Sequence, residues 1–173
     1  TIEKDSGINR KLPPMEEEDQ PDVIIKQKNI FTVLLNGKDQ LLVEDELMEI
    51  KDLRVAAVEF LDNNGDKSCT YCQGSKDPTS SDNPDKAIIS LKNERETSYA
   101  AYISVQNELV AAYNVLRNRR ALELGPQQGF REMNFVEMQQ NYKDARFVGN
   151  KEKLKAVIDQ IKLEFPQKLS EVQ

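Results

Sequence analysis

The sequence predicts an α+β domain in which a small mixed β-sheet packs against helices on one face. A flexible tether is expected before the sheet and extra helices after it. Two β-rich runs separated by a turn occupy 29–44, and from Ile50 the hydrophobic period changes from that of a strand to that of a helix. With 173 residues, of which 38% are hydrophobic and 31% charged, the chain is long enough for one domain with a proper core.

Residues 1–22 are expected to form the tether, and 23–173 the folded domain. The stretch GINRKLPPMEEEDQPD, residues 7–22, contains adjacent prolines and an acidic run, and it offers no apolar face to bury. Prolines keep a linker extended, and like charges stretch it further by repulsion. We therefore expect this segment to be an extended tether outside the folded core.

The first β-rich runs predict a hairpin. They lie on either side of Asn36-Gly37 and two further polar residues, a turn chemistry that tolerates positive φ. The first run is apolar on both sides, so we expect one face in the core and the other at least partly covered, by helices or by a second copy of the protein. The residues expected to form this partner-binding or dimer strand are Ile30, Phe31, Val33 and Leu35.

Helices and short strands are expected along the rest of the chain. Helical spacing from Ile50 predicts a helix laid on the sheet, and a polar loop over 62–86 leads to a short buried strand around 88–91. A long helix should start near Ser98 and end before Gly125. A weaker helical signal lies within 130–144, and Asn150 is the expected cap of a helix that Pro166 ends. The run QKLSEVQ, 167–173, is expected to close the sheet.

Cys69 and Cys72 stand in C-x-x-C spacing inside the polar loop. A redox centre of the thioredoxin kind needs this spacing between a strand end and a helix N-terminus, and the local sequence has loop character throughout. A zinc site would need two further ligands in a chain without histidine. The sequence favours a structural, inert loop disulfide, with the redox centre and the zinc site as alternatives.

Composition argues against several classes of function. The absence of histidine removes the commonest general base and the commonest zinc ligand. A net charge of −6 argues against nucleic acid as a partner, because phosphate binding needs a basic stripe. The sequence contains no glycine-rich phosphate loop and no nucleophile elbow. We therefore expect a non-enzymatic domain that uses no cofactor and no metal.

Three stretches carry a resemblance to a known family. They are GINRKLPP, DVIIKQKNIFTVLLNGKDQLLVEDELMEIKDLR and PDKAIISLKNERETSYAAYISVQNELVAAYNVLRN. In this order they resemble the periplasmic part of the ExbD/TolR family of biopolymer-transport proteins, and ExbD members with extended loops most of all. The resemblance covers residues 1–120 well and the remainder loosely. The 62–86 loop and the region after Gly125 are longer than the family domain requires.

The resemblance implies the periplasmic domain of a single-pass inner-membrane protein, which forms a homodimer. The implied partners are a TonB-like protein and an ExbB-like channel protein, the latter reached through a transmembrane helix that this sequence does not include. The proton-carrying aspartate of that helix therefore lies outside this sequence. The implied function is to couple inner-membrane proton flow to transport across the outer membrane. The alternative, from the TolR branch, is a structural adaptor that anchors to peptidoglycan.

The resemblance also suggests where partners bind. Leu12, Pro13 and Pro14 best match a family element that holds the linker against the folded domain or a partner, and an inert spacer is the alternative. We expect the partner to be captured by strand addition at an exposed edge of the sheet. The candidate edges are NIFTVLLN, 29–36, and QKLSEVQ.

Overall fold

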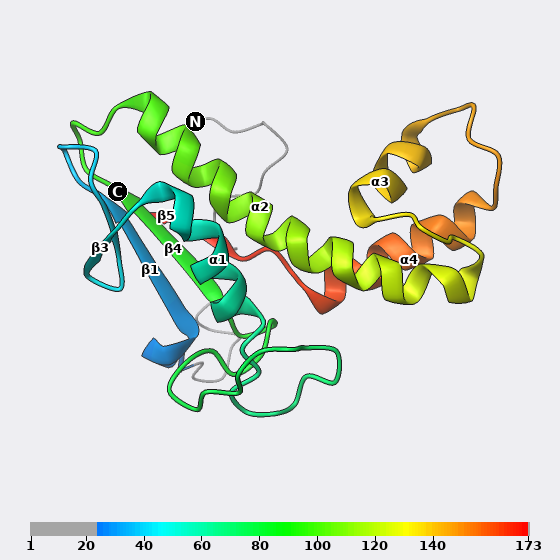
Figure 1. The fold of residues 1–173 in the computed structure, drawn as a ribbon, viewed down its shortest axis with the longest axis horizontal. Helices are drawn as coiled ribbons and strands as arrows, with labels where there is room; N and C mark the ends of the chain where they lie inside the picture. Colours follow the sequence, from blue (N-terminus) through cyan, green and yellow to red (C-terminus); the bar gives the residue numbers. More distant parts are fainter. Residues whose placement is uncertain (1–23, 173) are drawn as a thin grey trace, which may run out of the picture.

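The structure is a computed structural model that describes residues 24–172. Its elements, labelled in Figure 1, are in chain order η1 (Gln27–Asn29), β1 (Ile30–Leu35), β2 (Leu41–Val43), β3 (Glu46–Met48), α1 (Ile50–Leu61), β4 (Ile88–Asn93), α2 (Tyr99–Leu124), η2 (Gly125–Gln128), α3 (Phe135–Lys143), α4 (Lys151–Glu164) and β5 (Leu169–Val172). The expected α+β class is confirmed. The expected tether, residues 1–22, lies outside the described residues.

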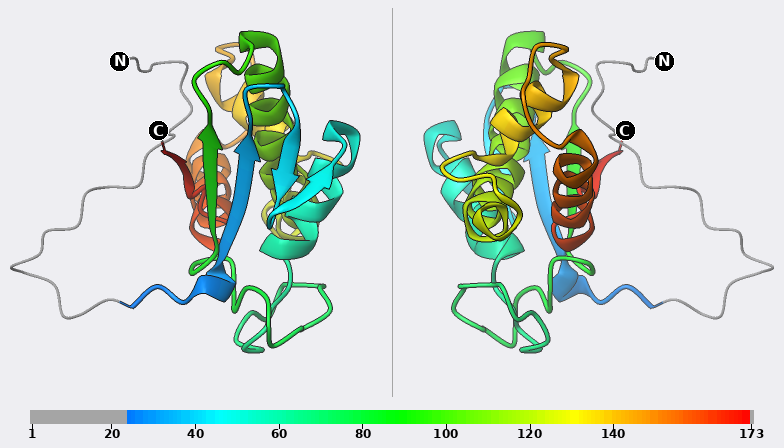
Figure 2. Two further views of the ribbon diagram at one scale, coloured as in Figure 1. Left: turned by 90° about the vertical axis from the view of Figure 1, so that its left-hand side faces the viewer. Right: turned by 90° about the vertical axis from the view of Figure 1, so that its right-hand side faces the viewer.

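The five strands form one mixed sheet in the order β3-β2-β1-β4-β5. Strand β1 pairs antiparallel with β2 and parallel with β4, while β5 pairs parallel with β4. In Figure 2 the helices lie together on one side of this sheet. The strand expected in the C-terminal run is therefore present, and it forms an edge.

The hairpin region differs from the expectation in two ways. A third strand, β3, follows β2 through a two-residue turn at Glu44 and Asp45, whose φ values are 50° and 69°. Positive φ at both central residues is typical of the tight turns that match the twist of a hairpin. In the first turn the left-handed residue is Asp39, at φ 59°, and not the Asn36-Gly37 pair.

Two hydrophobic cores share helix α2. The first fills the space between the sheet and the helices α1 and α2, and it contains alternate residues of the central strands. The second lies between the C-terminal part of α2, α3 and α4. Figure 1 shows these helices projecting beyond the sheet. The stripe expected for the last helix is buried in this second core, and it consists of Leu154, Val157, Ile158 and Ile161.

Helices α2 and α4 each begin directly after a residue whose side chain caps the helix. The Ser98 side chain accepts a hydrogen bond from the Ala101 N–H at 3.1 Å, and the Asn150 side chain accepts one from the Lys153 N–H at 3.0 Å. Each bond satisfies one of the free donors in the first helical turn. Both caps are the residues that the sequence indicates, which is why these two helices begin where expected.

Candidate functional site

The face of the sheet turned away from the helices carries a row of side chains across all five strands. Strand register pairs Leu34 with Leu42 and with Lys92, Leu42 with Leu47, and Lys92 with Val172. Because paired residues share a face, these five side chains form one line, called here the outer row. Leu47 and Val172 are 69% and 42% exposed, and Leu34 and Leu42 are half-buried.

The residues expected in the partner or dimer strand divide between the two faces. Phe31, Val33 and Leu35 are buried in the first core, with at most 5% of their surface exposed. Ile30 is half-buried on the outer face, where it pairs with Ile88. The apolar surface that β1 offers a partner is therefore that of Ile30 and Leu34.

Strand β1 is not an edge of the sheet. It lies between β2 and β4, pairing with β2 over Val33–Leu35 and with β4 over its whole length, so the NIFTVLLN run does not form a free edge of the sheet. That expectation was wrong because the position of a strand within a sheet depends on the path of distant segments. The free edges are β3 and β5.

Strand β5 is held by side chains as well as by its pairing. Leu169 is buried in the first core, and the Glu171 carboxylate accepts hydrogen bonds from the Tyr102 hydroxyl at 2.5 Å and the Gln106 amide at 2.7 Å. These contacts fix the inward side of the strand against α2. Ser170 and Val172 alternate with them and face outward with the outer row.

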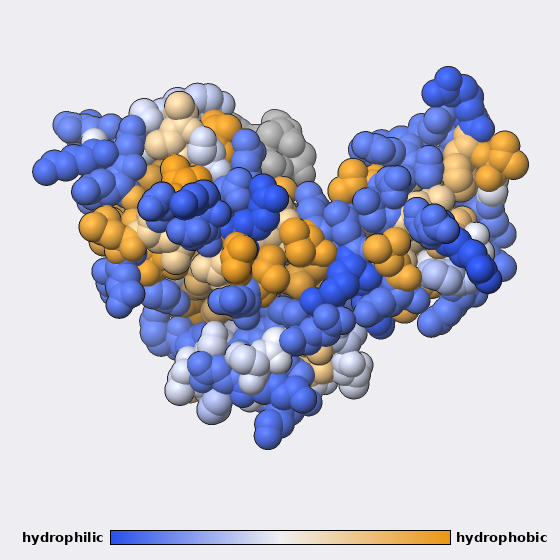
Figure 3. Space-filling view, in the orientation of Figure 1, coloured by the Kyte–Doolittle hydropathy of each residue, from blue (hydrophilic) through white to orange (hydrophobic). Residues whose placement is uncertain are grey.

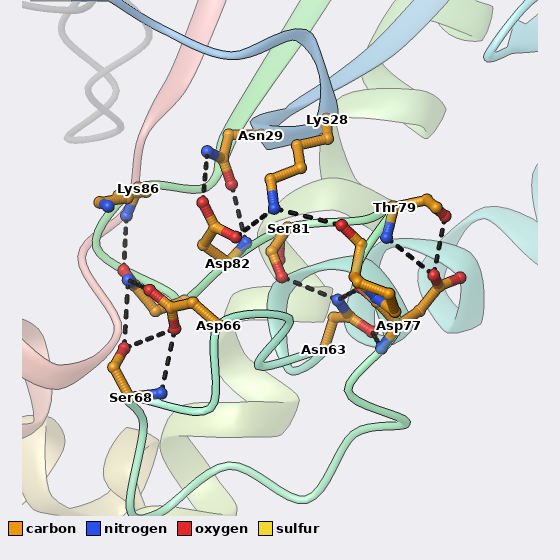
Figure 4. A network of polar contacts seen from close by, with 12 residues as sticks. Lys28, Asn29, Asn63, Asp66, Ser68, Asp77, Thr79, Ser81, Asp82 and Lys86 are labelled. Carbon is orange, nitrogen blue, oxygen red and sulfur yellow. Dashed lines mark hydrogen bonds and ion pairs between the residues drawn. The ribbon is translucent and has the colours of Figure 1, made fainter.

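The polar loop between α1 and β4 is folded around one buried side chain, that of Asn63. Its amide nitrogen donates to the carbonyl oxygens of Asp77 at 2.8 Å and Ser81 at 2.7 Å. Its amide oxygen accepts from the Asp77 N–H at 3.0 Å and the Ser75 hydroxyl at 3.1 Å. Figure 4 shows Asn63 bonded to residues from separate parts of the loop, among them Asp77 and Ser81. The hydrogen-bonding capacity of the amide is fully used, so the loop has a defined conformation.

A second set of contacts joins this loop to the segment that enters β1 (Figure 4). The Lys28 ammonium lies 2.5 Å from the buried Asp82 carboxylate, and Asn29 exchanges two hydrogen bonds with Asp82. The hydrogen bond from Lys28 is the largest influence that lowers the pKa of Asp82, and it outweighs the opposing effect of burial. The loop is therefore fastened to the start of the sheet.

Cys69 and Cys72 are joined in a disulfide with an Sγ–Sγ distance of 2.05 Å. Of the three alternatives left by the sequence, this is the loop disulfide, and the pair does not lie at a helix N-terminus. Within residues 24–172 no group of three or more histidine, cysteine, aspartate or glutamate side chains is placed to hold a metal ion.

The helical side of the molecule has a different surface. Figure 3 shows apolar patches over α1 and α2 interrupted by charged side chains. Val55 and Val115 are exposed there, and the Arg54 guanidinium forms a salt bridge with Glu108 at 3.0 Å between the two helices. In the described part of the chain no helix has both the length and the apolar composition to cross a membrane.

Three residues of the outer row, Leu42, Leu47 and Lys92, lie outside the runs that the sequence predicts as partner contacts. Leu42 and Leu47 flank the Glu44-Asp45 turn symmetrically, and a period of two on either side of that turn places them opposite each other. The signal was present but depended on recognising a turn without glycine or asparagine. Leu12, Pro13 and Pro14, the expected linker contacts, lie outside the described residues.

Comparison with known proteins adds no assignment. No protein-family model matches the chain, and no curated protein matches it at a significant level.

Proposed function

We propose that this chain is the periplasmic, non-enzymatic part of a proton-motive-force-driven complex of the TonB–ExbB–ExbD type. In this role the domain transmits inner-membrane proton flow to a TonB-like protein that powers transport across the outer membrane. The proposal rests on the resemblance of residues 1–120 to ExbD. The structural observation that supports it best is a one-sided sheet with two free edges, because such a sheet can bind an extended peptide.

The outer row suits contact with a second copy of the chain. Leu34, Leu42 and Leu47 form an apolar line across three neighbouring strands, and exposed apolar rows of this kind mark contact surfaces. A two-fold dimer would place the same row on both partners, so a contact through this face would cover the leucines of both copies. The domain is thus proposed to be a homodimer through the outer face of the sheet.

The edge strand β5 is the proposed site for the TonB-like partner. An added strand pairs with backbone groups and needs only alternate side chains to match, which suits a contact that must form and release repeatedly. The inward contacts of Leu169 and Glu171 hold β5 against α2. Its outer edge can therefore pair without disturbing the core.

The dimer is tested with two lysine substitutions at leucines of similar exposure. Leu47→Lys alters the outer row, where Leu47 is 69% exposed, and Leu163→Lys alters the surface of α4, where Leu163 is 74% exposed. Sedimentation velocity at increasing concentration should show a dimer for the parent and for Leu163→Lys, and a monomer for Leu47→Lys. A parent that stays monomeric at high concentration, or equal behaviour of the two variants, would contradict the proposed dimer.

The partner site is tested by titrating the isotope-labelled domain with peptides from the periplasmic linker of a TonB-like protein. Amide shifts are expected at Leu169–Val172, with little change at Lys38 or in α3. Shifts confined to 62–86 would show that strand addition at β5 is the wrong mechanism. Firm sedimentation of the domain with cell-wall sacculi, without peptide binding, would favour a peptidoglycan anchor instead.

A further inference from the structure

The Cys69–Cys72 disulfide closes a four-residue ring whose apex is Thr70 and Tyr71. The base of the ring is held by the body of the loop. Asn64 accepts a hydrogen bond from the Cys69 N–H at 2.9 Å and donates one to the Cys69 carbonyl at 2.9 Å. Both cysteines are only half-buried, so a small thiol can reach them.

The side chain of Tyr71 leaves this ring and reaches the end of α4. Its hydroxyl donates to the Glu164 carbonyl oxygen at 2.6 Å, across 93 positions of the sequence. Its ring lies 5.2 Å from the ring of Phe165 and 5.0 Å from the guanidinium carbon of Arg120, centroid distances typical of aromatic and cation–π contacts. The disulfide-closed ring therefore places the side chain of Tyr71 between α2 and the C-terminal end of α4.

This side chain meets the chain immediately before β5. The connector 165–168 joins Glu164, the last residue of α4, to the edge strand. Helix α2 also holds the connector, because Arg117 donates two hydrogen bonds to the Phe165 carbonyl and the Tyr113 hydroxyl accepts one from the Lys168 N–H. Tyr71 adds contacts with Glu164 and Phe165 from the disulfide ring.

We propose that the Cys69–Cys72 disulfide is a reducible clamp: while it is closed, Tyr71 holds the α4–β5 connector, and its reduction loosens the edge strand. The proposal rests on the function proposed above, since β5 is there the partner's edge, and it adds a thiol-dependent control of that edge. It revises the expectation that the disulfide is inert, and it requires no catalytic thiol.

The chemistry is ordinary thiol–disulfide exchange with a dithiol reductant. One thiolate of the reductant attacks Sγ of one cysteine, and the other cysteine leaves as a thiolate that takes up a proton. The second thiol of the reductant then displaces the first cysteine from the mixed disulfide. The protein gains two electrons and two protons, and the dithiol is oxidised to its own disulfide.

Reduction of the disulfide frees the apex of the ring, Thr70 and Tyr71. It acts less on the base, which Asn64 holds. The contacts of Asn64 with Cys69, and of Asp62 with the Gln73 N–H at 3.2 Å, do not involve sulfur, so breaking the disulfide does not remove their donors or acceptors. Thr70 and Tyr71 gain backbone freedom, because a short covalent ring no longer restricts them and the Tyr71 carbonyl keeps only the long hydrogen bond that it accepts from Arg119 at 3.4 Å. Holding Tyr71 against Phe165 then costs more conformational entropy, so the connector is released more often.

The test is hydrogen exchange of the whole chain, followed by mass spectrometry, in the oxidised form and after dithiothreitol. Peptides covering Leu169–Val172 should exchange about tenfold faster after reduction, the factor expected from losing one hydrogen bond and one aromatic contact. Amides of Ile30–Leu35 in the sheet centre serve as the internal reference and should be unchanged. A Cys69→Ser/Cys72→Ser variant should behave as the reduced protein without any reductant.

Substitution of Tyr71 separates the clamp from a general loss of stability. In oxidised protein, Tyr71→Ala should give the faster exchange at β5 and abolish any further effect of dithiothreitol, and Tyr71→Phe should lie between Tyr71→Ala and the parent. Unchanged exchange at β5 after reduction would overturn the clamp, as would equal acceleration at Ile30–Leu35. Peptide titration of oxidised protein tests the partner site separately, so failure of one proposal leaves the other measurable.

Discussion

Exchange of one atom in the Asn63 side chain should undo the fold of the 62–86 loop. Asn63→Asp keeps the shape of the side chain and replaces the amide nitrogen by an oxygen. That nitrogen donates to the carbonyls of Asp77 and Ser81, and in the variant both carbonyls face a carboxylate oxygen. The hydrogen bonds that the amide oxygen accepts from Asp77 N–H and Ser75 can persist.

The cost follows from the burial of the site, where Asn63 is 2% exposed. Leaving a buried carbonyl without its donor costs about 1–3 kcal/mol, so two such carbonyls give roughly 2–6 kcal/mol. The buried negative charge adds to this cost. We expect a loss of at least about 3 kcal/mol in the free energy of unfolding at neutral pH. The deficit should shrink as the pH falls toward about 4, because the protonated acid regains a donor.

Urea unfolding followed by circular dichroism measures this loss, and hydrogen exchange over 62–86 detects opening of the loop alone. Asn107→Asp is the matched control, since Asn107 is exposed on α2 and the same change of charge should cost little there. A stability within about 0.5 kcal/mol of the parent at neutral pH, with unchanged exchange in the loop, would refute the assigned role of Asn63.

Two further substitutions test the packing around α2. Arg117→Met keeps the aliphatic stem but leaves the Phe165 carbonyl without its donor and removes the cation above the Phe135 ring, so urea unfolding should show a loss of about 2 kcal/mol. Burial raises the pKa of Tyr113 to about 12, so its stabilising contribution is complete below pH 10 and is lost between pH 10 and 12. By pH 11 the ionisation of Tyr113 should account for roughly 1 kcal/mol of the decrease in the free energy of unfolding. Tyr113→Phe has no group to ionise there, so its free energy of unfolding should decrease by about 1 kcal/mol less over the same pH range.

The long helices could be predicted because their signals are local. Leu154, Val157, Ile158 and Ile161 repeat at helical spacing over two turns, and Asn150 stands where a cap is needed. Strand β3 could not be predicted in the same way. It has three residues, which is too few for a periodic signal, and its turn takes positive φ at Glu44 and Asp45. Positive φ is uncommon outside glycine, so the residue types of this turn give little sign of its conformation in the sequence.

Strand order was the part of the candidate site that local patterns could not reveal. The apolar run of β1 indicates burial on two sides, and both a central strand and a dimer edge satisfy that pattern. The choice depends on β4 and β5, whose sequences lie more than 50 positions further along the chain. The residue that the Tyr71 hydroxyl contacts is also distant in the sequence, since Glu164 lies 93 positions away. Contacts of this kind arise from the packing of whole elements.

The C-terminal helices determine whether the proposed partner edge exists. Strand β5 enters the sheet directly from α4, and α4 is positioned by the second core and by Arg117, whose guanidinium contacts both the Phe165 carbonyl and the Phe135 ring. Residues 126–173 lie beyond the part of the chain on which the proposed ExbD-like function rests, yet they supply the edge on which strand addition depends. It follows that changes in the second core, for example at Met138, should weaken partner binding at β5 without touching the partner. Substitutions in these helices would then change how firmly β5 is held, while the centre of the sheet stays unchanged.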